Sequence, residues 1–164
     1  MKKTSFTLPV GLAGQIEHIL ADVYHKARAE SILLADVSGQ LIDVQGQTLG
    51  MDPVIVAALA AGDVAALSEL ARQIGEKDHR GSFLHEGANK NIYLFGVNES
   101  FILIVIFRAD IPIGLVRLFA GRAVEQLHPL AVEFEQSLSQ PEEILDADFG
   151  AALADELEEV FGEL

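Results

Sequence analysis

Apolar positions along this chain change period in a fixed order, from helical spacing to short continuous runs and back. A stripe with helical spacing predicts a first helix that begins near Pro9. The stripe consists of Leu12, Ile16, Ile19, Leu20, Val23 and Ala27. Apolar runs at 31–36 and 41–44 then flank Ser38-Gly39, so we expect two strands joined by a tight turn.

A second helix is indicated by Asp52 and Pro53, an N-cap residue followed by proline in the first helical position. It is expected to run to about Gly75, with a break or kink near Gly62-Asp63. Residues 54–61 read Val-Ile-Val-Ala-Ala-Leu-Ala-Ala, with no polar side chain on any face. Because a surface helix carries one polar side, this helix is expected to be covered on two faces.

Three more strands and a long helix follow. Apolar runs predict strands at 82–86, 91–97 and 101–107. The last of these is apolar at every position, so both of its faces should be buried in the middle of the sheet. A stripe with helical spacing after Pro112 predicts a long helix, with a kink or a new segment at Pro129.

The short turns between these strands predict antiparallel pairing. The fold class is therefore α+β, a five-stranded antiparallel sheet sandwiched by helices in the order α-β-β-α-β-β-β-α. We place this domain at residues 1–140, and an acidic linker with a C-terminal amphipathic helix at residues 141–164.

The C-terminal segment carries nine acidic residues and no Lys or Arg, so it supplies −9 of the net charge of −14. Its apolar residues recur at helical intervals between the acidic ones. A helix of this length is marginal alone in water, so it must dock on something. Docking on its own domain and binding to a groove of a partner both stay open. The residues that would bind the partner are Phe149, Leu153, Leu157, Val160 and Phe161.

Composition narrows the classes of function. With 25 acidic against 11 basic residues, the surface repels phosphate backbones and anionic lipids, so we expect no nucleic-acid and no membrane partner. Uninterrupted apolar runs such as Phe101–Phe107 are far shorter than the about 20 residues of a membrane span. The absence of cysteine excludes disulfides and thiol chemistry and favours a cytoplasmic location.

No motif for catalysis or cofactor binding stands out. The sequence contains no GxxxxGK, GxGxxG, GxSxG or HExxH motif. The five histidines, at positions 18, 25, 79, 85 and 128, offer no closed set of metal ligands. We therefore expect a non-catalytic protein without a cofactor or metal ion. The doubly apolar helix at 54–61 instead predicts a homodimer, because a second apolar face left in water would form a patch that soluble monomers avoid.

Several strings, taken in order, resemble the roadblock family, relatives of a dynein light chain. They are the hairpin string Ile-Leu-Leu-Ala-Asp-Val-Ser-Gly-Gln-Leu-Ile at 32–42, the Ala-rich second helix, strand 101–107, and Ile-Gly-Leu-Val-Arg-Leu at 113–118. The resemblance covers about residues 12–138. The length of the chain and its C-terminal extension resemble in particular the bacterial MglB type.

This resemblance implies a roadblock/profilin-like fold and a homodimer whose sheets join edge to edge and whose second helices pair across the dyad. It also implies a partner, a small Ras-like GTPase, whose nucleotide cycle the dimer modulates like a GTPase-activating protein without needing to insert an arginine. The dimer interface is then assigned to Val54, Ala57, Ala58, Ala61, Phe83 and His85.

Two alternatives stay open. The first is a structural adaptor of the same family that has no effect on GTP hydrolysis. The second is a small-molecule sensor of the profilin-like or PAS-like kind, which needs a cavity. The bulky, uniform strand 101–107 favours a filled core over such a cavity.

Overall fold

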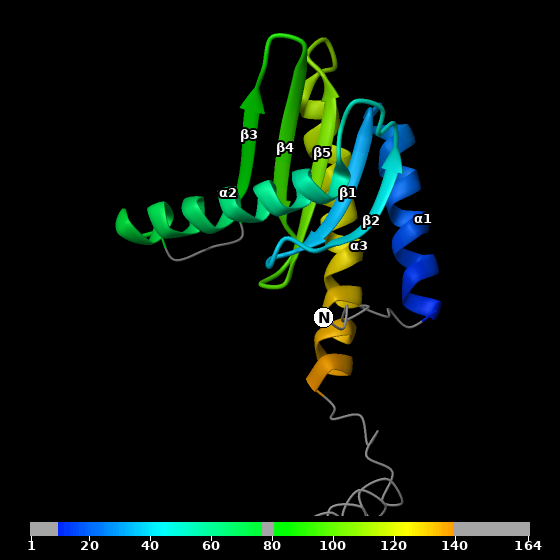
Figure 1. Cartoon of the computed structure of the whole chain (residues 1–164), viewed down its shortest axis with the longest axis vertical. Helices are drawn as coiled ribbons and strands as arrows, with labels where there is room; N and C mark the ends of the chain where they lie inside the picture. The colour runs from blue at the N-terminus through cyan, green and yellow to red at the C-terminus, as the bar shows by residue number, and fades with distance from the viewer. Residues whose placement is uncertain (1–9, 77–80, 140–164) are drawn as a thin grey trace, which may run out of the picture. The chain divides into compact units, whose positions relative to one another are not determined.

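The computed structural model describes residues 10–76 and 81–139 of the chain (Figure 1). The chain divides into two units, residues 1–134 and 135–164, and the fold below is that of the first unit. Within the described residues the order of elements is the predicted one. The elements are α1 (Val10–Lys26), β1 (Ser31–Asp36), β2 (Leu41–Gly46), α2 (Pro53–Gln73), β3 (Ser82–Glu86), β4 (Lys90–Gly96), β5 (Phe101–Arg108) and α3 (Ile113–Ser139).

The five strands form one antiparallel sheet with the order β2-β1-β5-β4-β3. β5 lies in the middle of the sheet, and its residues Phe101–Phe107 are all buried. An apolar run without alternation is what a strand requires when both of its faces are covered. The prediction of a central, doubly buried strand is therefore confirmed.

Alternate residues of the strands enter two separate cores, as the period of a strand dictates. Leu34 and Val105 pack with α1 and α3 on one face of the sheet. Leu33 and Ile104 pack with α2 on the other face. Full burial of each such side chain stabilises the folded state by about 1.5–3 kcal/mol. The sum over both cores holds the sheet between two helical layers.

The hairpin between β1 and β2 closes as the sequence predicts. One carboxylate oxygen of Asp36, Oδ1, accepts hydrogen bonds of 2.9 Å from the backbone N–H groups of Ser38 and Gln40. Gly39 adopts a positive φ of 91°, which glycine reaches without steric cost. The turn is thus built from a local acceptor and one glycine.

The start of α2 is confirmed, and the break that the sequence predicts within it is absent. The Asp52 carboxylate accepts a hydrogen bond of 2.9 Å from the Val54 N–H, and Pro53 occupies the first turn. The helix then continues to Gln73 without a break at Gly62. A glycine inside a helix costs about 1 kcal/mol. Packing of the neighbouring inner residues on the sheet outweighs that cost.

The long helix α3 likewise continues through Pro129, so the new segment expected there is absent. Pro129 is exposed, whereas Leu127 and Leu130 on either side of it are buried. Proline removes one backbone hydrogen bond. Burial of the flanking leucines holds the helix together across this gap.

Candidate interaction surface

Helix α2 leaves most of its apolar surface outside the folded domain. An 18-residue stretch of it has a mean hydropathy of 1.8, and only 17% of that stretch is buried. Among the described helices it alone is long and apolar enough to cross a membrane, judged by length and composition. The sequence argument from uninterrupted runs overlooked this property, because Gly62, Asp63 and Ser68 divide the apolar positions.

One narrow face of α2 is already used by its own sheet. Ala57, Ala60 and Ala61 are at most 6% exposed and pack in the same core as Leu33 and Ile104. Small side chains let the helix lie close to the strands. The side chains of Ala57 and Ala61 are thus buried against their own sheet, and the assignment of these two residues to a dimer interface stays a prediction.

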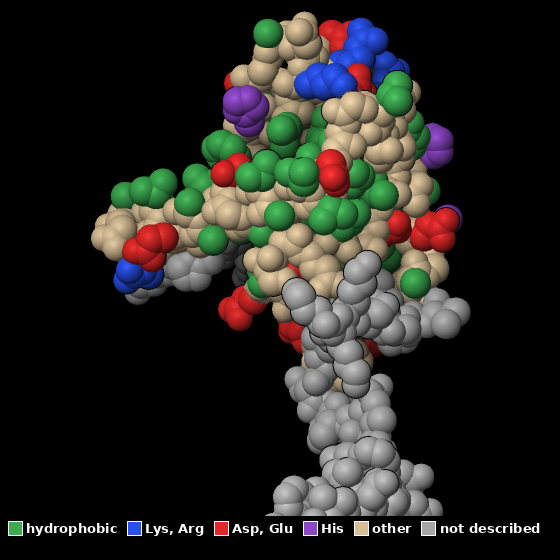
Figure 2. Space-filling model, in the orientation of Figure 1, with side chains coloured by type: hydrophobic (Ala, Val, Ile, Leu, Met, Phe, Trp, Pro, Cys, Tyr) green, Lys and Arg blue, Asp and Glu red, His purple; other side chains and the backbone are tan. Residues whose placement is uncertain are grey.

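Beside this face, α2 and the sheet enclose an apolar groove of about 520 Å³. Figure 2 shows hydrophobic side chains gathered along α2 and over the strands beside it. Leu59 and Leu70 of α2, which are 66% and 61% exposed, form one wall. Phe83 and His85, both expected at an interface, line the opposite wall from β3. The remaining lining residues are Val56, Ala60, Asp63, Ala66, Leu67, Ile92, Leu94 and Ile104.

The groove lies next to an open sheet edge. Within the described residues β3 pairs with β4 only, so its other edge has no neighbouring strand. Figure 1 shows α2 crossing the strands and projecting beyond β3. An uncovered edge strand is a template for pairing with another chain. The groove, the projecting helix and the open edge therefore form one continuous surface.

A second exposed face of α2 lies on the side away from the groove. Its residues recur at intervals of three and four, which places them on one side of a helix with about 100° per residue. All of them are exposed. We call this the outer face of α2, and it consists of Val54, Ala58, Gly62, Ala65, Glu69 and Arg72. Val54 and Ala58 thus belong to a different side of the helix from the groove.

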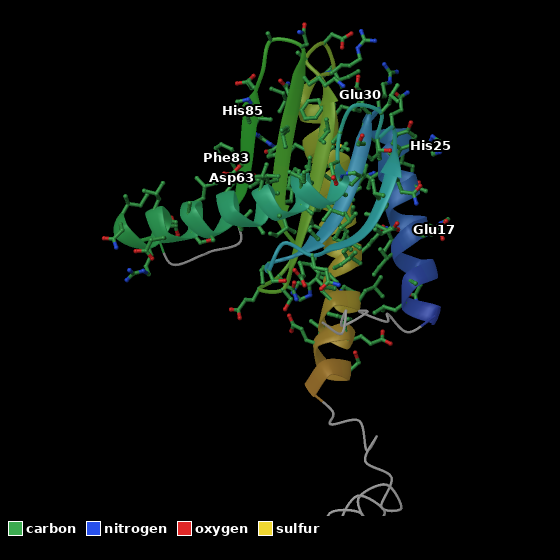
Figure 3. The ribbon with its side chains drawn as sticks, viewed as in Figure 1. Glu17, His25, Glu30, Asp63, Phe83 and His85 are labelled. Atoms are coloured by element: carbon green, nitrogen blue, oxygen red, sulfur yellow. The ribbon has the colours of Figure 1, made fainter. Side chains whose placement is uncertain are left out.

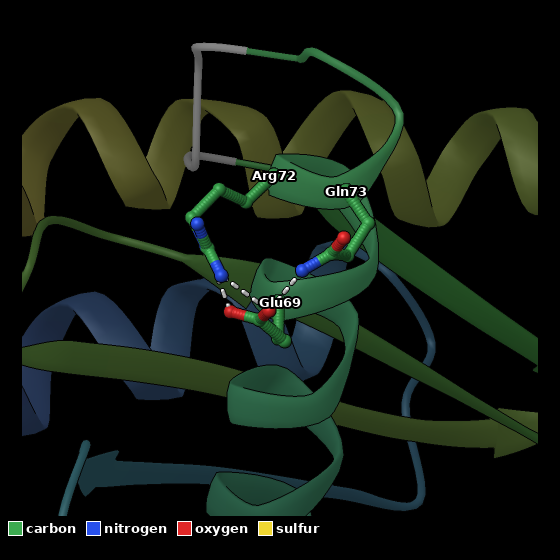
Figure 4. A network of polar contacts seen from close by, with 3 residues as sticks. All are labelled: Glu69, Arg72 and Gln73. Atoms are coloured by element: carbon green, nitrogen blue, oxygen red, sulfur yellow. Dashed lines mark hydrogen bonds and ion pairs between the residues drawn. The ribbon is translucent and has the colours of Figure 1, made fainter.

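The C-terminal end of this outer face carries a closed polar network (Figure 4). The Arg72 guanidinium donates to both carboxylate oxygens of Glu69, at 2.9 and 2.6 Å. The Gln73 side-chain amide donates to the same carboxylate at 2.7 Å. The hydrogen bonds from Arg72 and then Gln73 lower the pKa of the Glu69 carboxyl. Arg72 is therefore engaged within its own helix.

Two titratable side chains line the groove on opposite walls (Figure 3). Asp63 lies on α2 where the helix passes β3, and His85 lies two residues after Phe83 on β3. Both side chains are exposed. Within the described part of the chain, neither forms a hydrogen bond or an ion pair.

The described residues contain no group of three or more His, Asp or Glu side chains that could hold a metal ion. The tail positions expected to bind a partner, Phe149, Leu153, Leu157, Val160 and Phe161, lie outside the described residues. That assignment and the proposed domain boundary at residue 140 stay predictions. The candidate site that the structure presents is an exposed apolar surface built around α2.

Sequence reasoning missed much of the groove face of α2. Leu59, Asp63, Leu67 and Leu70 recur at helical spacing and line the groove. A projection of the whole helix, rather than of its first two turns, would have separated these residues from the inner alanines.

Comparison with known proteins gives a consistent result. Residues 15–107 match the family model of the Roadblock/LC7 domain. MglB from Myxococcus xanthus is 32% identical in sequence; the match covers 82% of this chain and 95% of that chain, with a TM-score of 0.71. The gliding protein MglB from Thermus thermophilus is 24% identical, with 80% and 99% covered and a TM-score of 0.70. A structure of MglB with tetrameric arrangement, 24% identical, covers 81% and 99% with a TM-score of 0.72. The two structures at 24% identity show the shared fold.

Proposed function

Because the chain belongs to the Roadblock/LC7 family and resembles MglB, we propose that it is a homodimeric regulator of a small Ras-like GTPase. It has no catalytic residue of its own in this proposal. It binds the GTPase and modulates the nucleotide cycle in the manner of a GTPase-activating protein.

The exposed apolar surface of α2 is the observation that carries the homodimer. Leu59 and Leu70 face an apolar groove, and only 17% of the apolar stretch of α2 is buried. An exposed apolar patch of this kind marks an interaction site. A second copy has the same projecting helix and the same open β3 edge. A two-fold axis beside β3 therefore covers both surfaces of each copy in one interface. The β3 strands then pair edge to edge, and each α2 fills the groove of the other copy.

The outer face of α2 is the surface that we assign to the GTPase. It stays free when the groove is filled, because the two faces lie on different sides of the helix. Gly62 and Ala65 are small and exposed, and a Cβ atom on Gly62 would meet nothing within 4 Å, so another backbone can approach closely there. Two-fold pairing of the helices places two such faces on one dimer.

The proposed regulation does not need an arginine inserted into the GTPase. Arg72, the one arginine on the outer face, donates both arms of its guanidinium to Glu69. We propose that the dimer acts by changing the conformation of the switch loops of the GTPase. Such loops are ordered or released by contacts around the γ-phosphate.

Single-turnover GTP hydrolysis tests this function. A small Ras-like GTPase of the same organism is loaded with GTP, and hydrolysis is followed with and without the full-length protein. Acceleration of at least about tenfold is expected, which is a barrier reduction of about 1.4 kcal/mol. A stable complex with unchanged hydrolysis would instead identify a roadblock-family adaptor, and absence of a complex would contradict both.

A further inference from the structure

The groove of α2 is apolar except for one acid and one base. Of the twelve residues that line it, only Asp63 and His85 are titratable. They lie on different elements, α2 and β3, and face the groove from opposite walls (Figure 3). Any helix seated in this groove therefore contacts a carboxylate on one side and an imidazole on the other.

Seating a helix in the groove removes water from both groups. A carboxylate taken out of water without a partner is strongly unfavourable, and an imidazole N–H left without an acceptor also carries a penalty. Among the residues that line the groove, His85 is the one side chain that can donate to Asp63. The two groups thus match in chemistry, and the groove offers no substitute for either.

Within residues 10–76 and 81–139, the charged groups next to the groove lie on other faces or are already paired. Glu69 and Arg72 of α2 bind each other on the outer face. Glu86 follows His85 on β3, so its side chain lies on the opposite face of the sheet. Lys90 at the start of β4 forms an ion pair with Glu30 at 2.5 Å.

Symmetry favours a contact between copies over one within a copy. A helix seated in the groove lies between the two walls, so it separates Asp63 from His85 of the same chain. Asp63 is the central residue of α2, which spans Pro53–Gln73. In two antiparallel helices that overlap about their middles, the central residues lie near the two-fold axis, so the two Asp63 carboxylates approach each other and each needs a donor. β3, as the edge strand, lies near the same axis.

We propose that Asp63 and His85 form the recognition pair of the homodimer. The α2 helix that enters the groove brings its Asp63 carboxylate to the His85 imidazole of the receiving copy, and symmetry forms the contact twice. This inference rests on the proposed homodimer. Its consequence is selectivity, because an apolar helix without an acid at this position leaves His85 buried and unpaired.

A double-mutant cycle on the full-length chain tests the pair. The dimer dissociation constant is measured by sedimentation equilibrium for the wild type, Asp63→Ala, His85→Ala and the double variant. Each single substitution is expected to raise this constant at least about tenfold, and the double variant to add no more than about threefold to the worse single. Glu86→Ala is the matched control on the same strand and should leave it within about twofold.

One further measurement separates recognition from a structural effect. The exchanged variant Asp63→His with His85→Asp should recover most of the lost affinity.

The outcomes distinguish the two proposals. A wild-type chain that stays monomeric at high concentration contradicts the homodimer itself. A wild-type dimer in which the two substitutions are additive, with no recovery on exchange, contradicts the recognition pair alone. Thermal unfolding of each variant checks the fold, and Asp63→Asn and His85→Gln provide isosteric replacements if an alanine variant unfolds.

Discussion

The backbone of Gly39 lies directly against Ala58. A Cβ atom built on Gly39 would be 2.8 Å from the Ala58 Cα, which is closer than real Cβ contacts allow. Gly39 lies in the loop between β1 and β2, and Ala58 lies in the second helical turn of α2. This contact fixes how deeply the N-terminal part of α2 sits on the sheet, and hence where its groove and outer faces point.

Replacing Gly39 by alanine is expected to destabilise the domain by two separate effects. A positive φ costs a non-glycine residue about 1–2 kcal/mol, and the overlap with Ala58 adds about 1–3 kcal/mol. Gly50→Ala is the matched control, because Gly50 also has a positive φ (78°) but a Cβ there meets nothing within 4 Å. Urea unfolding should show that Gly39→Ala lowers the free energy of unfolding clearly more than Gly50→Ala does. Equal losses would show that α2 moves aside freely.

Tyr93 carries a buried hydroxyl that joins β4 to α3. Its side chain is 2% exposed, and Arg117 Nε donates a 2.8 Å hydrogen bond to its hydroxyl oxygen. The Ser82 hydroxyl lies 3.3 Å from the same oxygen. Tyr93→Phe is expected to lower the free energy of unfolding by about 1–2 kcal/mol. Tyr24→Phe is the control, because the Tyr24 hydroxyl forms no hydrogen bond within the described residues, and it should change stability by less than about 0.5 kcal/mol.

The fold could be predicted from sequence because a local pattern of residues predicts each helix and each strand. The run Phe101–Phe107 has no polar position, and that alone placed it in the centre of the sheet. Asp52 with Pro53 similarly marked the start of α2. The expected break at Gly62 and the expected new segment at Pro129 are absent, because packing of neighbouring residues in the core overrides a local helix penalty.

The candidate site was harder to predict, because it depends on which side of α2 meets the sheet. Ala57 and Ala58 are adjacent and chemically identical, yet the first is buried and the second is exposed. No local pattern separates them: Ala57 packs in the core with Leu33 and Ile104, whereas Ala58 lies outside that core beside Gly39 of the first hairpin. The pairing of Phe83 and His85 with a groove likewise requires the strand order, which brings β3 to the edge beside α2.

The charged carboxylate of Asp43 is expected to lower the free energy of unfolding at neutral pH. Desolvation by burial raises the pKa of its carboxyl above 3.8, and the nearby charge of Glu17 adds to this, although a hydrogen bond from the Val44 N–H opposes it. A raised folded-state pKa means that the charged form destabilises the native state. The penalty is fully present above the raised pKa and is lost as the pH falls through it towards the unfolded value.

Asp43→Asn should therefore raise the melting temperature at pH 7, and the gain should shrink as the pH falls towards 4. Asparagine keeps an Oδ1 acceptor for the Val44 N–H at 2.7 Å, so the local hydrogen bond survives. Glu17→Gln is the comparison variant and should give a smaller gain, since its charge is a lesser cause than burial. A constant gain at all pH values would show that charge is not the reason.

Leu59→Asp is expected to break the proposed homodimer without unfolding the chain. Leu59 is 66% exposed and lines the groove, so a carboxylate there costs little in the monomer but is buried in the dimer. Leu118→Asp is the control, because Leu118 on α3 is 49% exposed and lies outside the groove. Sedimentation velocity should show a monomer for the first variant and an unchanged assembly for the second. A dimer that survives Leu59→Asp would place the interface elsewhere.

The outer face of α2 is tested at Gly62. A Cβ at this position meets nothing within 4 Å, so Gly62→Ala should stabilise the isolated protein by about 0.5–1 kcal/mol through helix propensity. A larger side chain, in Gly62→Leu, should leave the fold and the dimer intact but hold the GTPase away from the helix backbone. We expect its affinity for the GTPase, measured by titration calorimetry, to fall at least about tenfold. Gly14→Leu on α1 is the matched control, since a Cβ there also meets nothing within 4 Å. If both leucine variants bind the GTPase with equal affinity, the GTPase does not dock on the outer face of α2.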